Sequence, residues 1–479
     1  MHNITLLLTF LLTILATTIM SYVSLITPVG PWIAPILIVC ARMLMQWHVR
    51  CNESRVATVG YAVAGASAGG IIATACAFSL PAFYYNDPTL VTQLMAQPVL
   101  LWGLLVALIG CAAFIGYVCA QWYESTDAVR TLPFALSKLH ATMIHDAWSP
   151  MQIRRGIIGS VLMVTGELTR MLLCVQVSPL RSTGVLFPIV IAVGYVAGHL
   201  LLVPVAVGLS MKLVMQLNGV ESALMSVGAG MVIAATVQTM GAMLFTMVGG
   251  IKKVRYLNFV HYLRKVCVAN VMHGALGVLL CVPVLFGGTL MQAAYVVGAT
   301  GIAAYCLVTI AGAAGVAPLG RFATFAMVPA VLLFSFTQVQ GLLVAVWIEI
   351  VGGVCADLMI SRKMGQLLTL DATRVKQYQV WGLCLSVLCM ATLCVLLPAS
   401  LGIDTIAAYA SRARARALLV QAPAYALQPV HAVGGFLWGI VLHMMRVNVL
   451  LAFSGLLMPV ASSVGLLLGS CGAYWMRRS

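Results

Sequence analysis

Acidic side chains are scarce in this chain, in which Asp and Glu together number 11 among 479 residues. Lys and Arg number 26, so the formal net charge is +15, yet charged residues make up only 8% of the chain and hydrophobic residues 62%. Soluble globular domains carry roughly 25% charged residues. This composition therefore excludes a soluble globular domain.

Long polar stretches are also missing, since none exceeds about 30 residues, which is too short for a folded domain. Apolar runs of about 20 residues, the length that spans a bilayer as a helix, recur along the whole chain. They lie at 4–27, 31–47, 57–80, 98–120, 156–178, 184–210, 221–250, 266–288, 289–313, 320–335, 338–360, 377–398, 429–444 and 445–475. The pattern predicts an all-α polytopic membrane protein with 14–16 transmembrane or re-entrant helices, forming one domain over residues 1–479.

Signals for secretion and for covalent or metal cross-links are absent. The first apolar run has no Lys or Arg before it and no small-residue cleavage site, so we expect it to be the first spanning helix. The 14 cysteines contain no CxxC pair and lie mostly inside apolar runs. They are typical of small buried residues in a reduced protein, and we expect neither a metal site nor a cofactor.

The basic residues gather in connectors between the apolar runs. Positive residues concentrate in cytoplasmic loops, where they meet anionic lipid, so we expect all the clusters on the cytoplasmic side. Aromatic residues are not interleaved with them, which disfavours nucleic-acid binding. The clusters lie at 48–55, 154–155, 252–265 and 362–376.

Two stretches are too long or too interrupted for one helix: 184–216, which contains Pro204, and 445–475, which contains Pro459. Their sequences resemble each other over 201–209 and 456–466. Such paired interruptions indicate an internal duplication, with halves at 1–255 and 256–479, although chance similarity between biased strings stays an alternative. Residues 121–155 and 399–428 are predicted to be amphipathic or re-entrant connectors, with Arg412, Arg414 and Arg416 solvated.

Several short segments, in order along the chain, resemble motifs of the oligopeptide transporter family. The most specific is Ala356-Asp357-Leu358-Met359 followed by Lys363-Met364-Gly365-Gln366-Leu367-Leu368, after the small residues Gly352 and Gly353. Departures include Ala317, where the family has Asn before Pro-x-Gly, and Leu132-Pro133-Phe134, which lacks the family's following Pro-Glu-Gly. The other matching segment is 67–84.

The resemblance implies a proton-coupled symporter of small oligopeptides, not an enzyme, built as two pseudo-symmetric halves. A transporter of metal–chelate complexes, as in the yellow-stripe-like branch, is the alternative within the family. A non-transporting membrane subunit and a membrane-embedded enzyme are the alternatives outside it. No Walker motif is present, which disfavours ATP-driven pumping. The simplest location is a bacterial cytoplasmic membrane, and the oligomeric state stays open.

Two carboxylates lie deep inside apolar runs and are the leading proton-coupling candidates. Glu349 has no basic residue within a helical turn and shares its face with Gly352 and Gly353, so we expect it to face protein, as a coupling site or as a permanently neutral group. Glu167 is followed by Arg170 at i+3, a spacing that allows a structural ion pair or a gate.

The remaining candidates are weaker. His199 joins the proton-coupling set because it lies near Pro204, and His273 and His443 are substrate-pathway candidates in apolar runs. Asp357 matches the family motif, but it has two structural alternatives, pairing with Lys363 or capping the segment. Tyr84 is either a substrate contact or part of an interfacial aromatic belt. The pair His140 and His145 has a spacing that disfavours a metal site.

Overall fold

The computed structural model describes residues 2–26, 33–46, 52–124, 132–145, 199–220, 226–235, 288–315, 317–402, 410–421, 428–457 and 460–476, and a few isolated positions besides. These residues are almost entirely helical, and none of them forms a strand. Six of the described helices are long and apolar enough to cross a membrane. The expectation of an all-α, multi-pass membrane protein is therefore confirmed. The predicted spans 156–178 and 266–288 lie outside the described residues.

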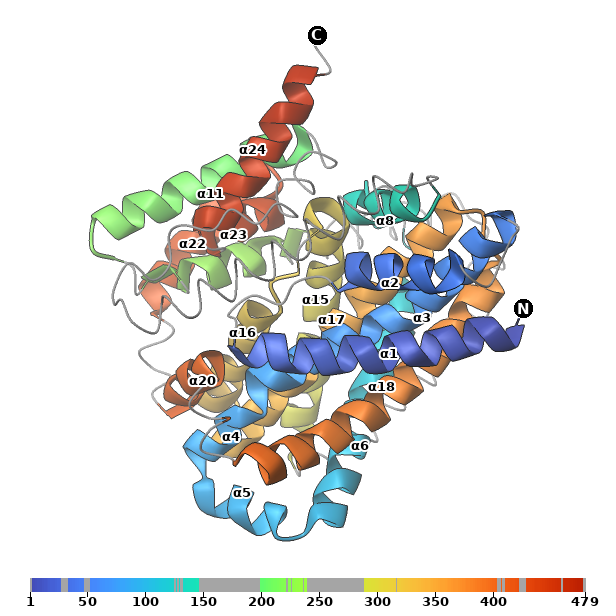
Figure 1. The fold of residues 1–479 in the computed structure, drawn as a ribbon. Coiled ribbons are helices and arrows are strands. Elements are labelled where there is room, and N and C mark those ends of the chain that lie inside the picture. Colours follow the sequence, from blue (N-terminus) through green and yellow to red (C-terminus); the bar gives the residue numbers. More distant parts are fainter. Residues whose placement is uncertain are drawn as a thin grey trace, which may run out of the picture.

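Six long helices form the body of the molecule (Figure 1). They are α1 (His2–Ile26), α3 (Asn52–Ser79), α6 (Pro98–Glu124), α15 (Leu290–Ala314), α17 (Gln338–Leu367) and α18 (Ala372–Leu401). Shorter helices connect or cover them: α2 (Ala34–Gln46), α4 (Pro81–Asn86), α5 (Pro88–Met95), α8 (Ala135–His145), α11 (His199–Leu217), α16 (Leu319–Leu333), α20 (Ser411–Gln421), α22 (Pro429–Met444), α23 (Val449–Leu457) and α24 (Val460–Met476).

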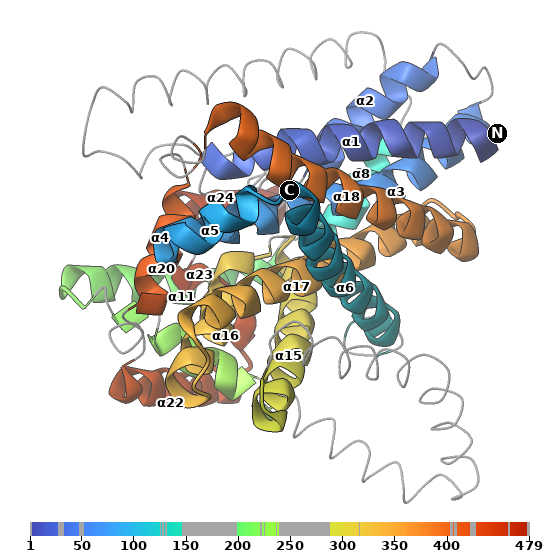
Figure 2. The same cartoon turned by 90° about the horizontal axis from the view of Figure 1, so that it is seen from below.

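Helix α17 is the central element. It packs against α3, α6, α15 and α16, with α6 and α15 flanking it in Figure 2, and nearly all of its apolar span is buried. A capping box starts it: Thr337 Oγ1 accepts from the N–H of Gln340, whose side chain accepts from the N–H of Thr337. Trp347 is fully buried and donates to Thr300 of α15 over 3.0 Å. The polar side chains of α17 therefore lie inside the helix bundle.

A line of hydroxyl residues joins α1 to α3. Thr9, Thr13, Thr17 and Ser21 recur every fourth residue, and each donates to the carbonyl four residues earlier over 2.7–2.8 Å. The hydroxyls are thus satisfied within the helix, as an apolar environment requires. The side chains of Thr9, Thr13 and Thr17 lie against Gly65 and Gly69 of α3, which brings the two helices close together.

Glycines also bring α3 close to α18. A Cβ atom at Gly382 would lie 1.9 Å from the carbonyl oxygen of Gly65, and one at Gly69 would lie 2.8 Å from Ser386 Oγ. Residue numbers rise together along the two helices, so α3 and α18 run parallel. Helix α17 runs antiparallel to α3, because Ser79 contacts Glu349 whereas Ser67 contacts Asp357.

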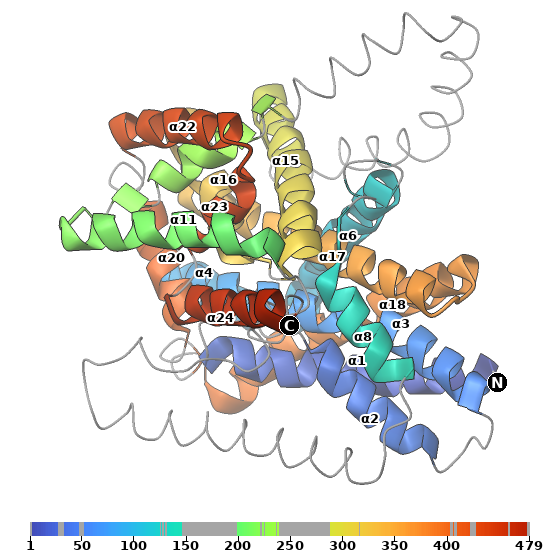
Figure 3. The ribbon, with the colours of Figure 1, turned by 90° about the horizontal axis from the view of Figure 1, so that it is seen from above.

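The C-terminal helices α22, α23 and α24 gather with α11 and residues 226–235 on the side away from α18 (Figures 1 and 3). Gly208 of α11 lies against the backbone of Ala452, and Gly435 lies against that of Val227. The two stretches predicted to be repeats are therefore packed together. Helix α11 continues through Pro204, so this proline does not interrupt it, and residues 184–198 of the first stretch lie outside the described residues. In the second stretch, α23 ends and α24 begins on either side of 458–459.

Two of the four basic clusters share one end of the bundle. The N–H of Asp371 donates to Tyr61 over 3.1 Å, and Leu368 and Leu370 lie against Gly60, so the start of α3 adjoins the α17–α18 turn. Arg55, Lys363 and Lys376 therefore lie at one end, called the basic end below. This grouping is what positive residues on one membrane face require. The clusters at 154–155 and 252–265 lie outside the described residues.

Candidate functional site

Three polar groups lie along α17, each held by partners from other helices. Glu349 lies in its first half, Asp357 about 12 Å further along, and Arg362 about 7.5 Å beyond that, at a rise of 1.5 Å per residue. All three side chains are buried. Because an ionised group inside a membrane protein is costly and usually functional, this line is the candidate site.

Glu349 is held by a bidentate ion pair with Arg416 of α20. Arg416 Nη2 lies 2.7 Å from Oε1 and Nη1 lies 2.9 Å from Oε2, and the exposed fractions of the two side chains are 5% and 0%. Ser79 at the end of α3 donates to the same carboxylate and accepts from Arg416. The expectation that Glu349 lacks a basic neighbour holds only within its own helix, because the partner comes from 67 residues away in sequence.

Helix α20 presents Arg416 through its alanine face. Ala410, Ala413 and Ala417 are buried against α4, α16 and α17, whereas Arg414 points outward and is exposed. Small side chains let the short helix approach its neighbours closely enough for the guanidinium to reach Glu349. The prediction of a solvated arginine connector is therefore wrong for Arg416, although it holds for Arg414.

Asp357 has a hydroxyl partner in place of a counter-charge. Ser67 of α3 donates to Asp357 Oδ2 over 2.7 Å, and its oxygen lies 3.0 Å from Ser361 Oγ. The three residues are 2–4% exposed. Neither structural alternative is found, because Asp357 lies mid-helix and, among the described residues, forms no ion pair with Lys363 or any other cation. A negative charge on Asp357 would therefore have no counter-charge within this part of the chain.

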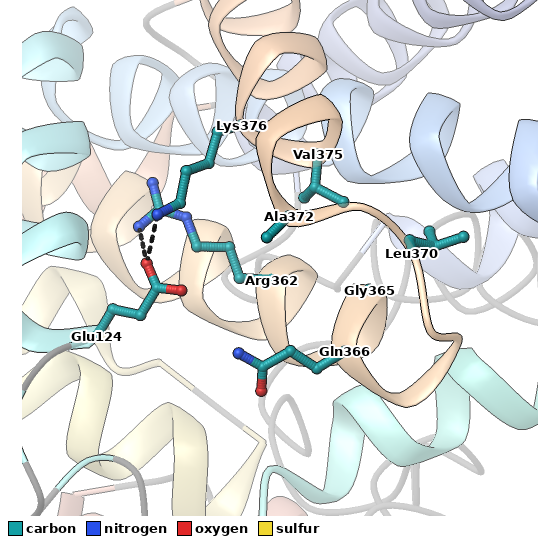
Figure 4. Close-up of a pocket in the computed structure, with 8 residues that line it drawn as sticks. All are labelled: Glu124, Arg362, Gly365, Gln366, Leu370, Ala372, Val375 and Lys376. Atoms are coloured by element: carbon teal, nitrogen blue, oxygen red, sulfur yellow. Dashed lines mark hydrogen bonds and ion pairs between the residues drawn. The ribbon is translucent and has the colours of Figure 1, made fainter.

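A second ion-paired cluster lies at the basic end, around a pocket of about 20 Å³ (Figure 4). Glu124 Oε2 lies 3.0 Å from Arg362 Nη1 and 3.1 Å from Lys376 Nζ. Arg362 also donates through Nε to Gln379 over 3.1 Å and lies 5.3 Å from the ring centre of Tyr117. The pocket has room for about one water molecule.

The other sequence candidates lie away from this line or outside the described residues. Tyr84 is half-buried on α4, with its ring 6.2 Å from that of Tyr85. His443 is exposed in the last turn of α22, and His199 begins α11. Glu167, Arg170 and His273 fall on residues that the structure does not describe. None of these assignments is tested by the placement.

His140 is buried on α8, which is not among the six spanning helices. Its Nε2 has no hydrogen-bond partner among the described residues, and burial lowers the pKa of His140 to about 3. His145 on the same helix is exposed. No cluster of three or more His, Cys, Asp or Glu residues in the described part of the chain is suited to hold a metal ion.

Sequence reasoning missed Arg416, Ser67 and the Glu124–Arg362 pair as parts of the site. Arg412, Arg414 and Arg416 recur every second residue, which on a helix places Arg414 on the face opposite the other two; this was a usable signal that they do not all face solvent. Ser67 and Glu124 gave no such signal, because their partners come from distant segments of the chain.

No protein-family model matches the chain, and no curated protein matches its sequence. The resemblance to oligopeptide transporters therefore stays an expectation based on short motifs.

Proposed function

We propose that this protein is a proton-coupled secondary transporter that imports small oligopeptides across a bacterial cytoplasmic membrane. The observation that carries the proposal is Asp357, a buried carboxyl group on the central spanning helix that contacts the Ser67 hydroxyl and no cation among the described residues. A single negative charge in such surroundings is balanced by a proton or by a bound cation. A group of this kind can exchange its proton when the surroundings change.

The ion pairs on either side give the proposal its mechanism. The Glu349–Arg416 pair lies on one side of Asp357 along α17, and the Glu124–Arg362–Lys376 cluster lies on the other. In alternating access, one closure opens while the other stays shut, so that the central group meets one side of the membrane at a time. We assign the proton site to Asp357 and the two closures to the ion pairs, and Glu349 serves the closure opposite the basic end.

Breaking either closure exposes charged groups that are now paired. Opening the Glu349–Arg416 pair requires water or a substrate to replace the bidentate contact. A peptide carries an amino group, which is suited to replace Arg416 as the partner of Glu349. It also carries a carboxyl group, which is suited to replace Glu349 as the partner of Arg416. This match favours a zwitterionic substrate and accounts for the choice of peptides as the cargo.

Uptake by the purified protein in liposomes tests the function. With an inward proton gradient, we expect labelled short peptides to accumulate and a protonophore to abolish the accumulation. Accumulation of iron–chelate complexes alone would assign the protein to metal–chelate transport. If neither accumulates in protein shown to be folded, the transport proposal fails and a non-transporting subunit becomes the better account.

A further inference from the structure

Cys76 of α3 and Cys394 of α18 meet where these two helices pack together. Cys76 is buried and Cys394 is partly buried, and the two thiols lie near enough to interact electrostatically. Neither residue has a part in the ion pairs or in the Asp357 site. Two thiols close together on separate helices are suited to chemistry that a single buried thiol cannot perform.

The helix register independently supports this proximity. Gly69 of α3 lies against Ser386 of α18, and Gly65 lies beside Gly382 one turn earlier. Cys76 follows Gly69 by seven residues and Cys394 follows Ser386 by eight, which is about two helical turns on each parallel helix. The backbones therefore bring both cysteines to the same level along the α3–α18 contact.

We propose that Cys76 and Cys394 form an oxidisable dithiol whose disulfide ties α3 to α18. Each thiol gives up its proton and one S–S bond forms, while the two protons and two electrons reduce a lipid-soluble quinone to its hydroquinone. Helix α18 is the least buried of the six spanning helices. The oxidant therefore reaches the partly exposed Cys394 from the lipid side.

A disulfide between Cys76 and Cys394 would lie close to the Glu349–Arg416 ion pair. Cys76 lies one turn before Ser79, whose hydroxyl contacts both Glu349 and Arg416. A disulfide would hold α3 against α18 at that level. The dithiol itself does not depend on the proposed transport, so its test is independent of uptake.

Oxidation of the full-length protein in membrane vesicles tests the proposal. The vesicles receive a lipid-soluble quinone, free thiols are blocked with N-ethylmaleimide, and the digested protein is analysed by mass spectrometry. We expect a linked peptide pair containing Cys76 and Cys394, loss of two blocked thiols, and disappearance of the pair after reduction. Cys389→Ser, at a partly buried cysteine on the same helix, is the matched control and should leave the pair unchanged.

The outcome is decided by which cysteines become linked. Cys394→Ser should abolish the linked pair, and Cys76→Ser gives the same test if the first variant is poorly folded. Absence of the pair in oxidised wild-type protein, or linkage of Cys394 to other cysteines as often as to Cys76, would overturn the proposal.

Discussion

At the scale of single residues, the Glu349–Arg416 pair combines a short bidentate contact with nearly complete burial. Removing both charges from water is costly, and their attraction offsets that cost only while both partners are present. The pair is therefore more sensitive to single substitutions than to a paired one. This property separates a true buried ion pair from two groups that merely lie close together.

Substitution of one partner should destabilise the protein strongly. We expect Arg416→Gln or Glu349→Gln to cost about 3–5 kcal/mol, because each leaves a buried charge without its partner. The double variant should cost less than the sum of the two. Thermal unfolding of the four proteins in detergent measures the coupling, and Arg414→Gln on the exposed face of α20 should change little. Additive losses would contradict the pairing.

His140 should make the packing of α8 sensitive to acid. Because its pKa in the folded protein is about 3, whereas that of an unfolded His is about 6.5, the unfolded state binds the additional proton. Stability from the neutral His is present above about pH 6.5 and falls as the pH decreases. We expect α8 to exchange amide hydrogen faster at pH 5.5 than at pH 7.5, after correction for intrinsic rates.

The control for this effect is His140→Leu, which cannot take up a proton. Its exchange in α8 should be nearly independent of pH over the same range. An equal acid response in the variant would show that another group is responsible.

At the scale of helices, the contacts between elements depend on backbone approach at a few glycines. A Cβ atom at Gly382 would lie 1.9 Å from the carbonyl oxygen of Gly65, so α3 and α18 can pack at their present separation only with glycine there. The sequence displays these glycines only as part of a general richness in small residues. Which of them lie in a contact is determined by the packing.

Gly382→Ala should therefore force α3 and α18 apart. We expect loss of several degrees in the unfolding temperature in detergent, because backbone atoms cannot move aside as a flexible side chain can. Gly103→Ala on α6 is the matched control, since a Cβ atom there meets nothing within 4 Å. Its helix should be unchanged or slightly more stable. Equal behaviour of the two variants would contradict the close contact.

At the scale of the whole molecule, the sequence predicted the helical, multi-pass character because apolar runs and scarce charge are local signals. Burial of Glu349 also followed from the small residues on its face. The partner of Glu349 did not, because Arg416 reaches it only after α20 packs into the bundle. The predicted halves and the transport function are not tested by the fold.

The arrangement of the basic end makes a prediction about orientation. Arg374 lies at that end and is exposed, whereas Thr89 lies beyond α4 near the other end. We expect Thr89→Cys to react with a membrane-impermeant maleimide in intact cells and Arg374→Cys to react only after permeabilisation. The reverse pattern would place the basic end outside and contradict the predicted cytoplasmic side of the basic clusters.

The most direct test of the account is proton movement by the Asp357→Asn variant in liposomes. Wild-type protein should acidify the liposome interior when peptide is added outside, as reported by an enclosed pH dye. Asp357→Asn should lose this acidification while still exchanging labelled for unlabelled peptide, because only the proton site is removed. Asp371→Asn, the same change at an exposed helix cap, should behave as wild type. Full acidification by Asp357→Asn would contradict Asp357 as the coupling group.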